Sequence, residues 1–241
     1  MMTRNLHDLF GKGKAVIGMI HLAGKGRREK IDRALDEIAL YKDEGLAGAI
    51  IEDYHGDMDD LKATLEMINW RSTRIIIGVN ALRSTRHTFE LAHNYGARFV
   101  QVDSVQTRDL DVERYIEFRE KYSDIVVLGG VRFKYTRQTG NTLEKDLVEA
   151  MPRCDAIVTT GEGTGIETPL EKLQEFRQSL SWLGGFPLIS GAGVTADNVR
   201  EQMKICDAVI VGSYFKNGNT ENEVYRENVS KLMNAVRSIQ S

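Results

Sequence analysis

The sequence has little cysteine and no long hydrophobic run. Its two cysteines, Cys154 and Cys206, lie far apart and outside any C-x-x-C spacing, so neither a structural zinc site nor a redox pair is expected. No stretch reaches the ~18 apolar residues that a membrane-spanning helix needs, and the opening segment lacks the apolar core of a signal peptide. These absences favour a protein of the reducing cytoplasm without a membrane partner.

The chain also lacks an excess of charge of one sign. Its formal net charge is −3, and acidic and basic residues alternate along it. A protein that follows a nucleic-acid backbone needs a basic surface, so no nucleic-acid partner is expected, and only a local anion site stays open. With 41% hydrophobic residues, the 241-residue chain can bury one sizeable core without disulfides, and we expect one domain over residues 1–241.

Short apolar segments recur along the chain, and an amphipathic stretch follows each of them. The predicted strands are Ala15–Met19, Ala47–Glu52, Arg74–Asn80, Arg98–Asp103, Ile125–Val131, Asp155–Thr160, Phe186–Ser190 and Ala208–Gly212. The predicted helices are Glu29–Glu44, Asp59–Trp70, Arg83–Tyr95, Asp111–Tyr122, Asn141–Met151, Pro169–Leu183, Asp197–Lys204 and Asn222–Gln240. Strands that are apolar on both faces belong to a buried parallel sheet.

Two α/β architectures fit such a repeat, a doubly wound sheet and a single (β/α)₈ TIM barrel. A doubly wound dinucleotide-binding fold would carry a glycine fingerprint after its first strand, and this sequence has none there. Eight consecutive units in a chain close to the ~250 residues typical of the barrel favour the barrel. Its functional side chains should lie where the strands end, at the C-terminal face.

Polar residues do stand at almost every predicted strand end. They are His21, Glu52, Asp53, Asn80, Gln101, Asp103, Arg132, Lys134, Thr159, Thr160, Ser190 and Ser213. Alternation along the fourth strand places Val100 and Val102 toward the helices, and Gln101 and Asp103 inward. The same argument directs Asn80 of the third strand inward.

Two glycine-rich turns follow the last two predicted strands. Gly191 and Gly193 lie in the first turn, and Gly212 and Ser213 lie in the second. Glycines let backbone N–H groups approach an anion closely, and these two strand ends are a common phosphate site in barrels, so we expect a phosphorylated small-molecule ligand here. The alternative is that the glycines only allow tight turns.

A third glycine-rich segment, Gly161–Gly165, follows the sixth strand. It predicts a mobile lid or a further wall of the ligand site. We expect Thr160 and Gly161 to contact the phosphorylated ligand. The alternative is a connection that touches no ligand.

Glu52 and Asp103 close strands on facing parts of the barrel, which suits a pair of acid and base groups. The alternative is a structural ion pair with Arg132 or Lys134. Lys134 would otherwise stabilise an oxyanion or form a Schiff base. His21 is equally consistent with a proton carrier and with a packed residue at the rim.

The segment Glu52–Asp57 contains possible metal donors, but adjacent strand residues point in opposite directions and no second cluster completes a coordination sphere. Neither a metal nor an organic cofactor is expected.

Several motifs together resemble the BtpA/SgcQ family over residues 14–235. They are Ile17–Leu22, Gly48–Asp53, Gly78–Arg83, Ala156–Gly161 and Ser190–Thr195. The resemblance implies a ribulose-phosphate-binding barrel that holds phosphorylated sugars through its last two loops, where Gly191, Gly193, Gly212 and Ser213 match. Family members carry labels that range from a photosystem I biogenesis factor to a relative of phosphoribosylanthranilate isomerase.

The isomerase mechanism does not carry over unchanged. Related isomerases have an acidic or thiol base after the first strand, where this chain has His21, and its fifth strand ends in Arg132 and Lys134 rather than a carboxylate. The loops Ala23–Gly26 and Asp53–Asp57 also depart from the family pattern, which affects the choice of substrate.

Two functions therefore stay open at this stage. The first is an enzyme that isomerises or cleaves a phosphorylated sugar or nucleotide-like compound, with Glu52, Asp103, Lys134, His21 and Asn80 as its catalytic residues. The second is an assembly factor that has kept the barrel without turnover. A homo-oligomer is compatible with either function. The number of polar strand ends favours the enzyme.

Overall fold

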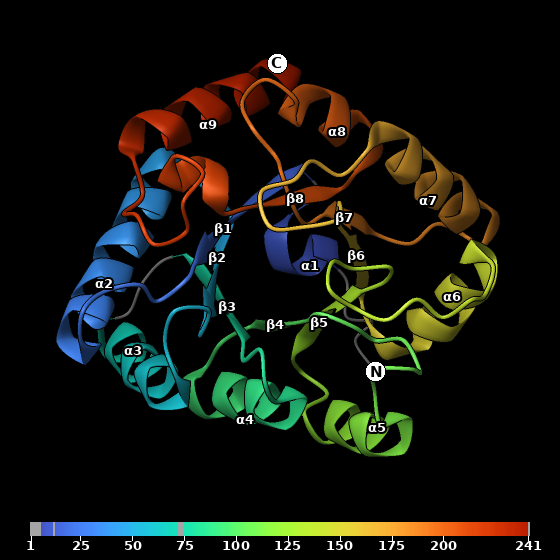
Figure 1. Ribbon diagram of the computed structural model, residues 1–241, viewed down its shortest axis with the longest axis horizontal. Coiled ribbons are helices and arrows are strands. Elements are labelled where there is room, and N and C mark those ends of the chain that lie inside the picture. The colour runs from blue at the N-terminus through green and yellow to red at the C-terminus, as the bar shows by residue number, and fades with distance from the viewer. Residues whose placement is uncertain (1–5, 12, 72–74, 241) are drawn as a thin grey trace.

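Eight parallel strands form a closed barrel in a computed structural model that describes residues 6–11, 13–71 and 75–240. Each strand pairs with the next along the chain, and β8 returns to pair with β1. Figure 1 looks down the barrel and shows the helices arranged around it. The predicted (β/α)₈ barrel is confirmed.

The observed strands begin and end within two residues of the predicted ones. They are β1 (Ala15–Ile20), β2 (Gly48–Glu52), β3 (Ile76–Asn80), β4 (Phe99–Val102), β5 (Val126–Gly130), β6 (Ala156–Thr159), β7 (Leu188–Ser190) and β8 (Ala208–Val211). The predicted start of the third strand, residue 74, lies outside the described residues.

The helices follow the strands as expected. They are α1 (Leu6–Phe10), α2 (Arg27–Glu44), α3 (Met58–Arg71), α4 (Thr85–Tyr95), α5 (Val112–Lys121), α6 (Leu143–Ala150), α7 (Leu170–Trp182), α8 (Val199–Ile205) and α9 (Arg226–Gln240), with 3₁₀ turns η1 (Met151–Arg153) and η2 (Ser213–Lys216). The predicted start of the last helix at Asn222 is wrong. The Asn222 side-chain amide donates to the carbonyl of Lys216, which holds this residue in the loop before α9. Among the described residues, no helix is long and apolar enough to cross a bilayer.

The core has two layers, one inside the barrel and one between the strands and the helices. Phe99 belongs to the inner layer, whereas Val100 and Val102 pack in the outer layer, as the alternation predicts. Inward-facing positions at the C-terminal ends of the strands are polar, and Gln101 is only 4% exposed there. The barrel is therefore filled with apolar side chains below and with polar groups at one end.

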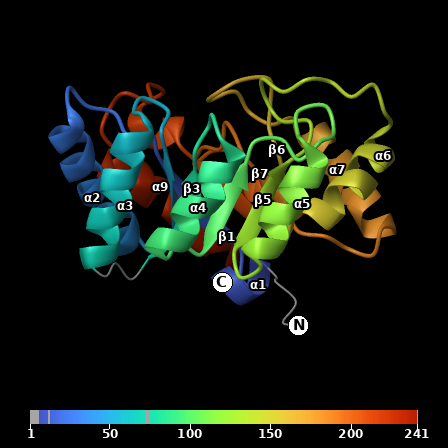
Figure 2. The ribbon, with the colours of Figure 1, turned by 90° about the horizontal axis from the view of Figure 1, so that it is seen from below.

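Helix α1 closes the other end of the barrel, and the sequence did not predict it. Leu6 lies in the inner core layer, and the rings of Phe10 and Phe99 meet edge to face with centroids 5.4 Å apart. Figure 2 shows α1 beneath the barrel, on the side away from the long loops. A five-residue helix has too few positions to show a periodic pattern, and tertiary packing stabilises it. The C-terminal end is therefore the one that α1 leaves uncovered.

Candidate active site

A cavity of about 150 Å³ lies at the C-terminal mouth of the barrel, and we call it the mouth cavity. Its lining includes His21, Glu52, Gln101, Asp103 and Lys134, together with the turn residues Gly191, Gly193, Gly212 and Ser213. The structure therefore brings the predicted acid and base residues and the predicted phosphate loops to one place. Thr160 and Gly161 lie outside this lining, in the wall of a neighbouring cavity.

Neutral amides hold the two carboxylates in place. The Asn80 amide donates to Oε1 of Glu52 at 2.9 Å and to Oδ1 of Asp103 at 3.0 Å. The Gln101 amide donates to the same Asp103 oxygen at 2.8 Å. Asn80 is 2% exposed and does not line the cavity, so it positions the carboxylates from beneath.

Glu52 is held in a state that suits a proton donor. Burial, and then the nearby Asp103 carboxylate, raise the pKa of Glu52 from its usual 4.5 to about 8, although Lys134 opposes the shift. Glu52 therefore keeps its proton at neutral pH.

His21 is held in its neutral form. Burial, followed by the charge of Lys216, lowers the pKa of His21 well below its usual 6.5. Its Nδ1 atom is buried and has no hydrogen-bond partner among the described residues. The ring lies against Gly212, where a Cβ atom would come within 2.8 Å of Cε1. His21 is therefore a neutral imidazole with a ring nitrogen that has no partner among the described residues, next to the turn after β8.

Lys134 is positioned by its backbone. Its N–H donates to Oγ1 of Thr160 at 2.6 Å, which joins the loops after β5 and β6. Arg132 does not form the ion pair with Glu52 or Asp103 that was considered as an alternative, because its guanidinium is paired with Asp146 at 2.9 Å. Lys134 is therefore the basic residue of this segment that lines the mouth cavity.

The turn after β7 has a steric need for glycine. Gly193 has a φ of +65°, and a Cβ atom there would lie 2.2 Å from the backbone nitrogen of Glu167. Tight packing thus explains why a glycine is needed here. Separately, the Gly193 N–H has no acceptor among the described residues. The N–H of Ser213, at the start of η2, is equally free there, whereas that of Gly191 donates to Thr159 at 2.9 Å. Two free amides on neighbouring turns suit an oxyanion.

The segment Gly161–Gly165 forms a wall of the mouth cavity through Thr164 and Gly165. The N–H of Thr164 donates to the Tyr135 hydroxyl at 3.0 Å, and the hydroxyls of Tyr54 and Thr164 are 3.5 Å apart. Tyr54 and Tyr135 thus line the site as well, and no sequence pattern singles them out.

Two lysines near the strand ends were also missed. Lys216, 1% exposed, forms an ion pair with Glu37 of α2. Lys172 of α7 donates to the carbonyls of Arg132 and Thr160 at 2.9 and 2.6 Å. Both lie in helical segments with ordinary polar spacing, so only the folded arrangement identifies them.

The potential metal donors after β2 serve the local fold. Asp53 accepts from the N–H of Leu82 at 2.9 Å, and Asp57 accepts from the N–H of Asp60 at 2.8 Å. Within residues 6–11, 13–71 and 75–240, no three His, Cys, Asp or Glu side chains gather as metal ligands would.

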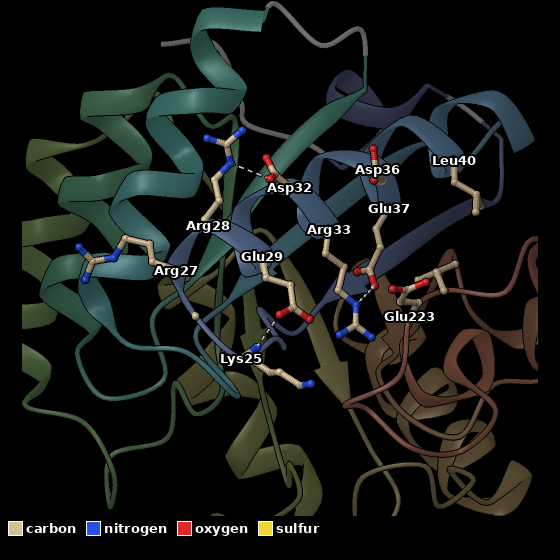
Figure 3. A pocket seen from close by; sticks show the side chains of 12 residues that line it. Lys25, Arg27, Arg28, Glu29, Asp32, Arg33, Asp36, Glu37, Leu40 and Glu223 are labelled. Carbon is tan, nitrogen blue, oxygen red and sulfur yellow. Dashed lines mark hydrogen bonds and ion pairs between the residues drawn. The ribbon is translucent and has the colours of Figure 1, made fainter.

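A larger hollow of about 910 Å³ runs along α2, and we call it the α2 groove. Four basic and five acidic side chains line it. Figure 3 shows several of these charges in pairs, with Arg28 beside Asp32 at 2.7 Å and Arg33 beside Glu37 at 3.7 Å. The groove largely neutralises itself and offers little to an ion of one sign.

Comparison with known proteins places the chain in context. Two uncharacterised proteins, from Archaeoglobus fulgidus and Pyrococcus abyssi, are each 28% identical to it, covering 93% and 94% of this chain and 99% and 97% of their own.

Solved structures with the same fold include one described as "Native KDPGal structure", with a TM-score of 0.67, 13% identity, and coverage of 93% of this chain and 95% of that one. Thiamine phosphate pyrophosphorylase from Pyrococcus furiosus has a TM-score of 0.66 at 15% identity, covering 95% and 98%. Phosphoribosyl anthranilate isomerase from Thermococcus kodakaraensis has a TM-score of 0.61 at 16% identity, covering 93% and 99%. At such low identity these likenesses concern the fold. The model of one family matches residues 12–238, and the chain therefore belongs to the BtpA family.

Proposed function

We propose that the protein is an enzyme that acts on a phosphorylated sugar or nucleotide-like compound by acid and base chemistry. The observation that carries this proposal is the shared mouth cavity, which joins the β7 and β8 turns to Glu52, Asp103 and Lys134. The fold neighbours named above include enzymes whose names contain phosphorylated compounds, which supports the same class of ligand.

The phosphate group would accept hydrogen bonds from the N–H groups of Gly193 and Ser213. Among the residues that the structure describes, Lys134 is the one lysine or arginine in the lining of this cavity. Backbone amides and a single cation suit one phosphate ester better than a polyphosphate, which needs more positive charge.

The sugar would then extend toward the carboxylates. The proton on Glu52 can be given to a carbonyl or leaving oxygen, and the Asp103 carboxylate can remove a proton from carbon. Lys134 would stabilise negative charge that develops on oxygen, and neutral His21 could pass a proton through its free Nδ1. Isomerisation, aldol-type cleavage and C–N cleavage all require these steps.

Binding is tested first, by calorimetry with ribose 5-phosphate and with ribose. We expect binding of the phosphate ester alone. Ser213→Asp should abolish it, because the new carboxylate repels the phosphate. Ser181→Asp adds the same charge on the exposed end of α7 and should leave the affinity unchanged. Equal binding of ribose and ribose 5-phosphate would contradict the proposal.

Proton transfer is tested second, by ¹H NMR of pentose and hexose phosphates incubated with the protein in D₂O. We expect at least one compound to exchange a carbon-bound hydrogen or to convert to product, and both Glu52→Gln and Asp103→Asn to stop the change. If esters bind but none reacts, the protein is a binding or assembly factor and the enzymatic part of the proposal fails.

A further inference from the structure

A second cavity, of about 720 Å³, lies next to the mouth cavity, and we call it the β5–β6 cavity. Its wall consists of the segment 132–141 after β5, the residues 160–162 after β6, Gln106, Pro169 and Lys172. Phe133, Lys134 and Tyr135 line both cavities, so one short segment is the partition between them.

The charges around the β5–β6 cavity are strongly one-sided. Its basic residues are Arg132, Lys134, Arg137 and Lys172, and the acidic residue in the lining is Glu162. Asp146 pairs with Arg132 from outside the lining, so Lys134, Arg137 and Lys172 carry the excess of positive charge. In the α2 groove, by contrast, acidic and basic side chains are almost equal in number. A concave site with an excess of cations attracts an anionic ligand.

Lys172 is fixed at the bottom of this arrangement. Its ammonium donates to the carbonyls of Arg132 and Thr160, which leaves one of its three N–H groups for another acceptor. Burial, and then the charge of Arg132, lower the pKa of Lys172 to about 8. An anion in contact with Lys172 would offset this repulsion and favour the charged amine.

Gln106 supplies an independent observation. It is 3% exposed, and its Oε1 accepts the backbone N–H of Arg132 at 2.7 Å, which fixes the orientation of the amide. The Nε2 group is buried and has no partner among the described residues, although Gln106 lines the cavity. Buried amide donors are normally paired, so a free one at a cationic cavity indicates a missing acceptor.

We infer that the β5–β6 cavity is a second oxyanion subsite, which takes a carboxylate or phosphate at the far end of the ligand held by Gly193 and Ser213. This placing of the far end rests on the proposed function. The substrate is then a small compound with acidic groups at both ends, a phosphorylated sugar acid or a bisphosphate. Lys134 lies on the wall between the two subsites and faces the reacting carbons.

Calorimetry with three probes tests the inference. Glycerol 3-phosphate has one acidic end, 3-phosphoglycerate adds a carboxylate, and fructose 1,6-bisphosphate adds a phosphate. We expect at least one doubly acidic probe to bind tenfold or more tightly than glycerol 3-phosphate. Which of the two gains identifies the group that the subsite prefers.

Three variants locate the effect. Lys172→Met keeps the aliphatic stem and Arg137→Ala changes an exposed residue, and each should reduce the tenfold advantage to less than threefold. Neither should change the affinity for glycerol 3-phosphate. Lys231→Met removes an exposed charge on α9 and should have no effect. Equal binding of all three probes, or an equal loss for all three in Lys172→Met, would overturn the subsite and leave the proposed phosphate site intact.

A second measurement does not depend on the mouth cavity. The side-chain amide resonance of Gln106, assigned from its absence in Gln106→Glu, is followed by ¹⁵N NMR during titration with inorganic phosphate. We expect a saturable shift in the wild type and no shift in Lys172→Met. A shift that persists in Ser213→Asp shows that the β5–β6 cavity binds phosphate without the mouth cavity. An unmoved Gln106 resonance in the wild type rejects the second subsite.

Discussion

The mouth of the barrel and the α2 groove are both polar hollows, but their charges are arranged in opposite ways. In the α2 groove, acidic and basic side chains face one another across one or two helical turns, as Arg28 and Asp32 do at 2.7 Å. At the mouth, neutral amides of Asn80 and Gln101 hold the carboxylates, and Lys134 is left to face the cavity.

The difference shows why the larger hollow is not the better candidate. Exposed ion pairs on a helix are satisfied within the protein and are worth little to its stability. A buried, protonated Glu52 close to a second carboxylate is costly to keep, and perturbed groups of this kind gather at functional sites, so the mouth cavity is the better candidate. Size alone would have selected the α2 groove.

The largest effect on stability is expected at the mouth of the barrel, from Gly193→Ala in the turn after β7. The added Cβ would meet the backbone of Glu167, and the left-handed φ adds strain, so we expect a loss of about 3 kcal/mol in the free energy of unfolding. Gly185 has a φ of +79° but open space around it, and Gly185→Ala should cost only about 1 kcal/mol. Urea denaturation measures both values. Equal costs would show that the β7 turn is not tightly packed.

The next largest effect is expected from Asn80→Ala. This change removes the amide between the buried Glu52 and the half-buried Asp103, and we expect a loss of about 2 kcal/mol in the free energy of unfolding. It should also raise the pKa of Glu52 further, because a hydrogen bond that favours the ionised form is lost. Asn234→Ala, on the exposed face of α9, is the matched control and should change little. An unchanged free energy of unfolding in Asn80→Ala would mean that this amide does not stabilise the carboxylates of Glu52 and Asp103.

A third test uses pH. The pKa of Glu52 is about 8 in the folded protein and near 4.5 when unfolded, so the folded state keeps a proton that the unfolded chain has lost between these values. The free energy of unfolding should therefore fall, through this group, as pH rises from about 4.5 to about 8. Glu52→Gln should remove that slope. Urea denaturation at pH 5, 7 and 9 compares the two proteins, and parallel profiles would contradict the raised pKa.

The smallest effect is expected in the α2 groove. Replacing both Arg28 and Asp32 by alanine removes an exposed i,i+4 ion pair, which should change the free energy of unfolding by less than ~0.5 kcal/mol. The affinity for ribose 5-phosphate should stay the same. A marked loss of affinity in this double variant would shift attention from the mouth to the groove.

Much of the architecture could be predicted, because the strands and most helices show local patterns of apolar and polar residues. The strand that contains Val100 and Val102 alternates cleanly, so its inward residues, Gln101 among them, followed from the sequence. Helix α1 could not be predicted, because its five residues gain their stability by packing Leu6 and Phe10 under the barrel.

Part of the candidate site could also be predicted from local sequence patterns. Strand ends are visible in a sequence, and this identified Glu52, Asp103 and the glycine turns. Asn80 joins two carboxylates beneath the cavity, and the Lys172 ammonium binds two backbone carbonyls. Both roles depend on contacts between different strands and helices. Local spacing contains no information on such contacts, so sequence patterns could not assign them.

The most direct test of the account is a crystal structure of the protein grown with ribose 5-phosphate. The account predicts the phosphate group within hydrogen-bond distance of the N–H groups of Gly193 and Ser213, with the sugar pointing toward Glu52. A phosphate bound in the α2 groove instead, or a mouth cavity that stays empty at saturating ligand, would contradict it.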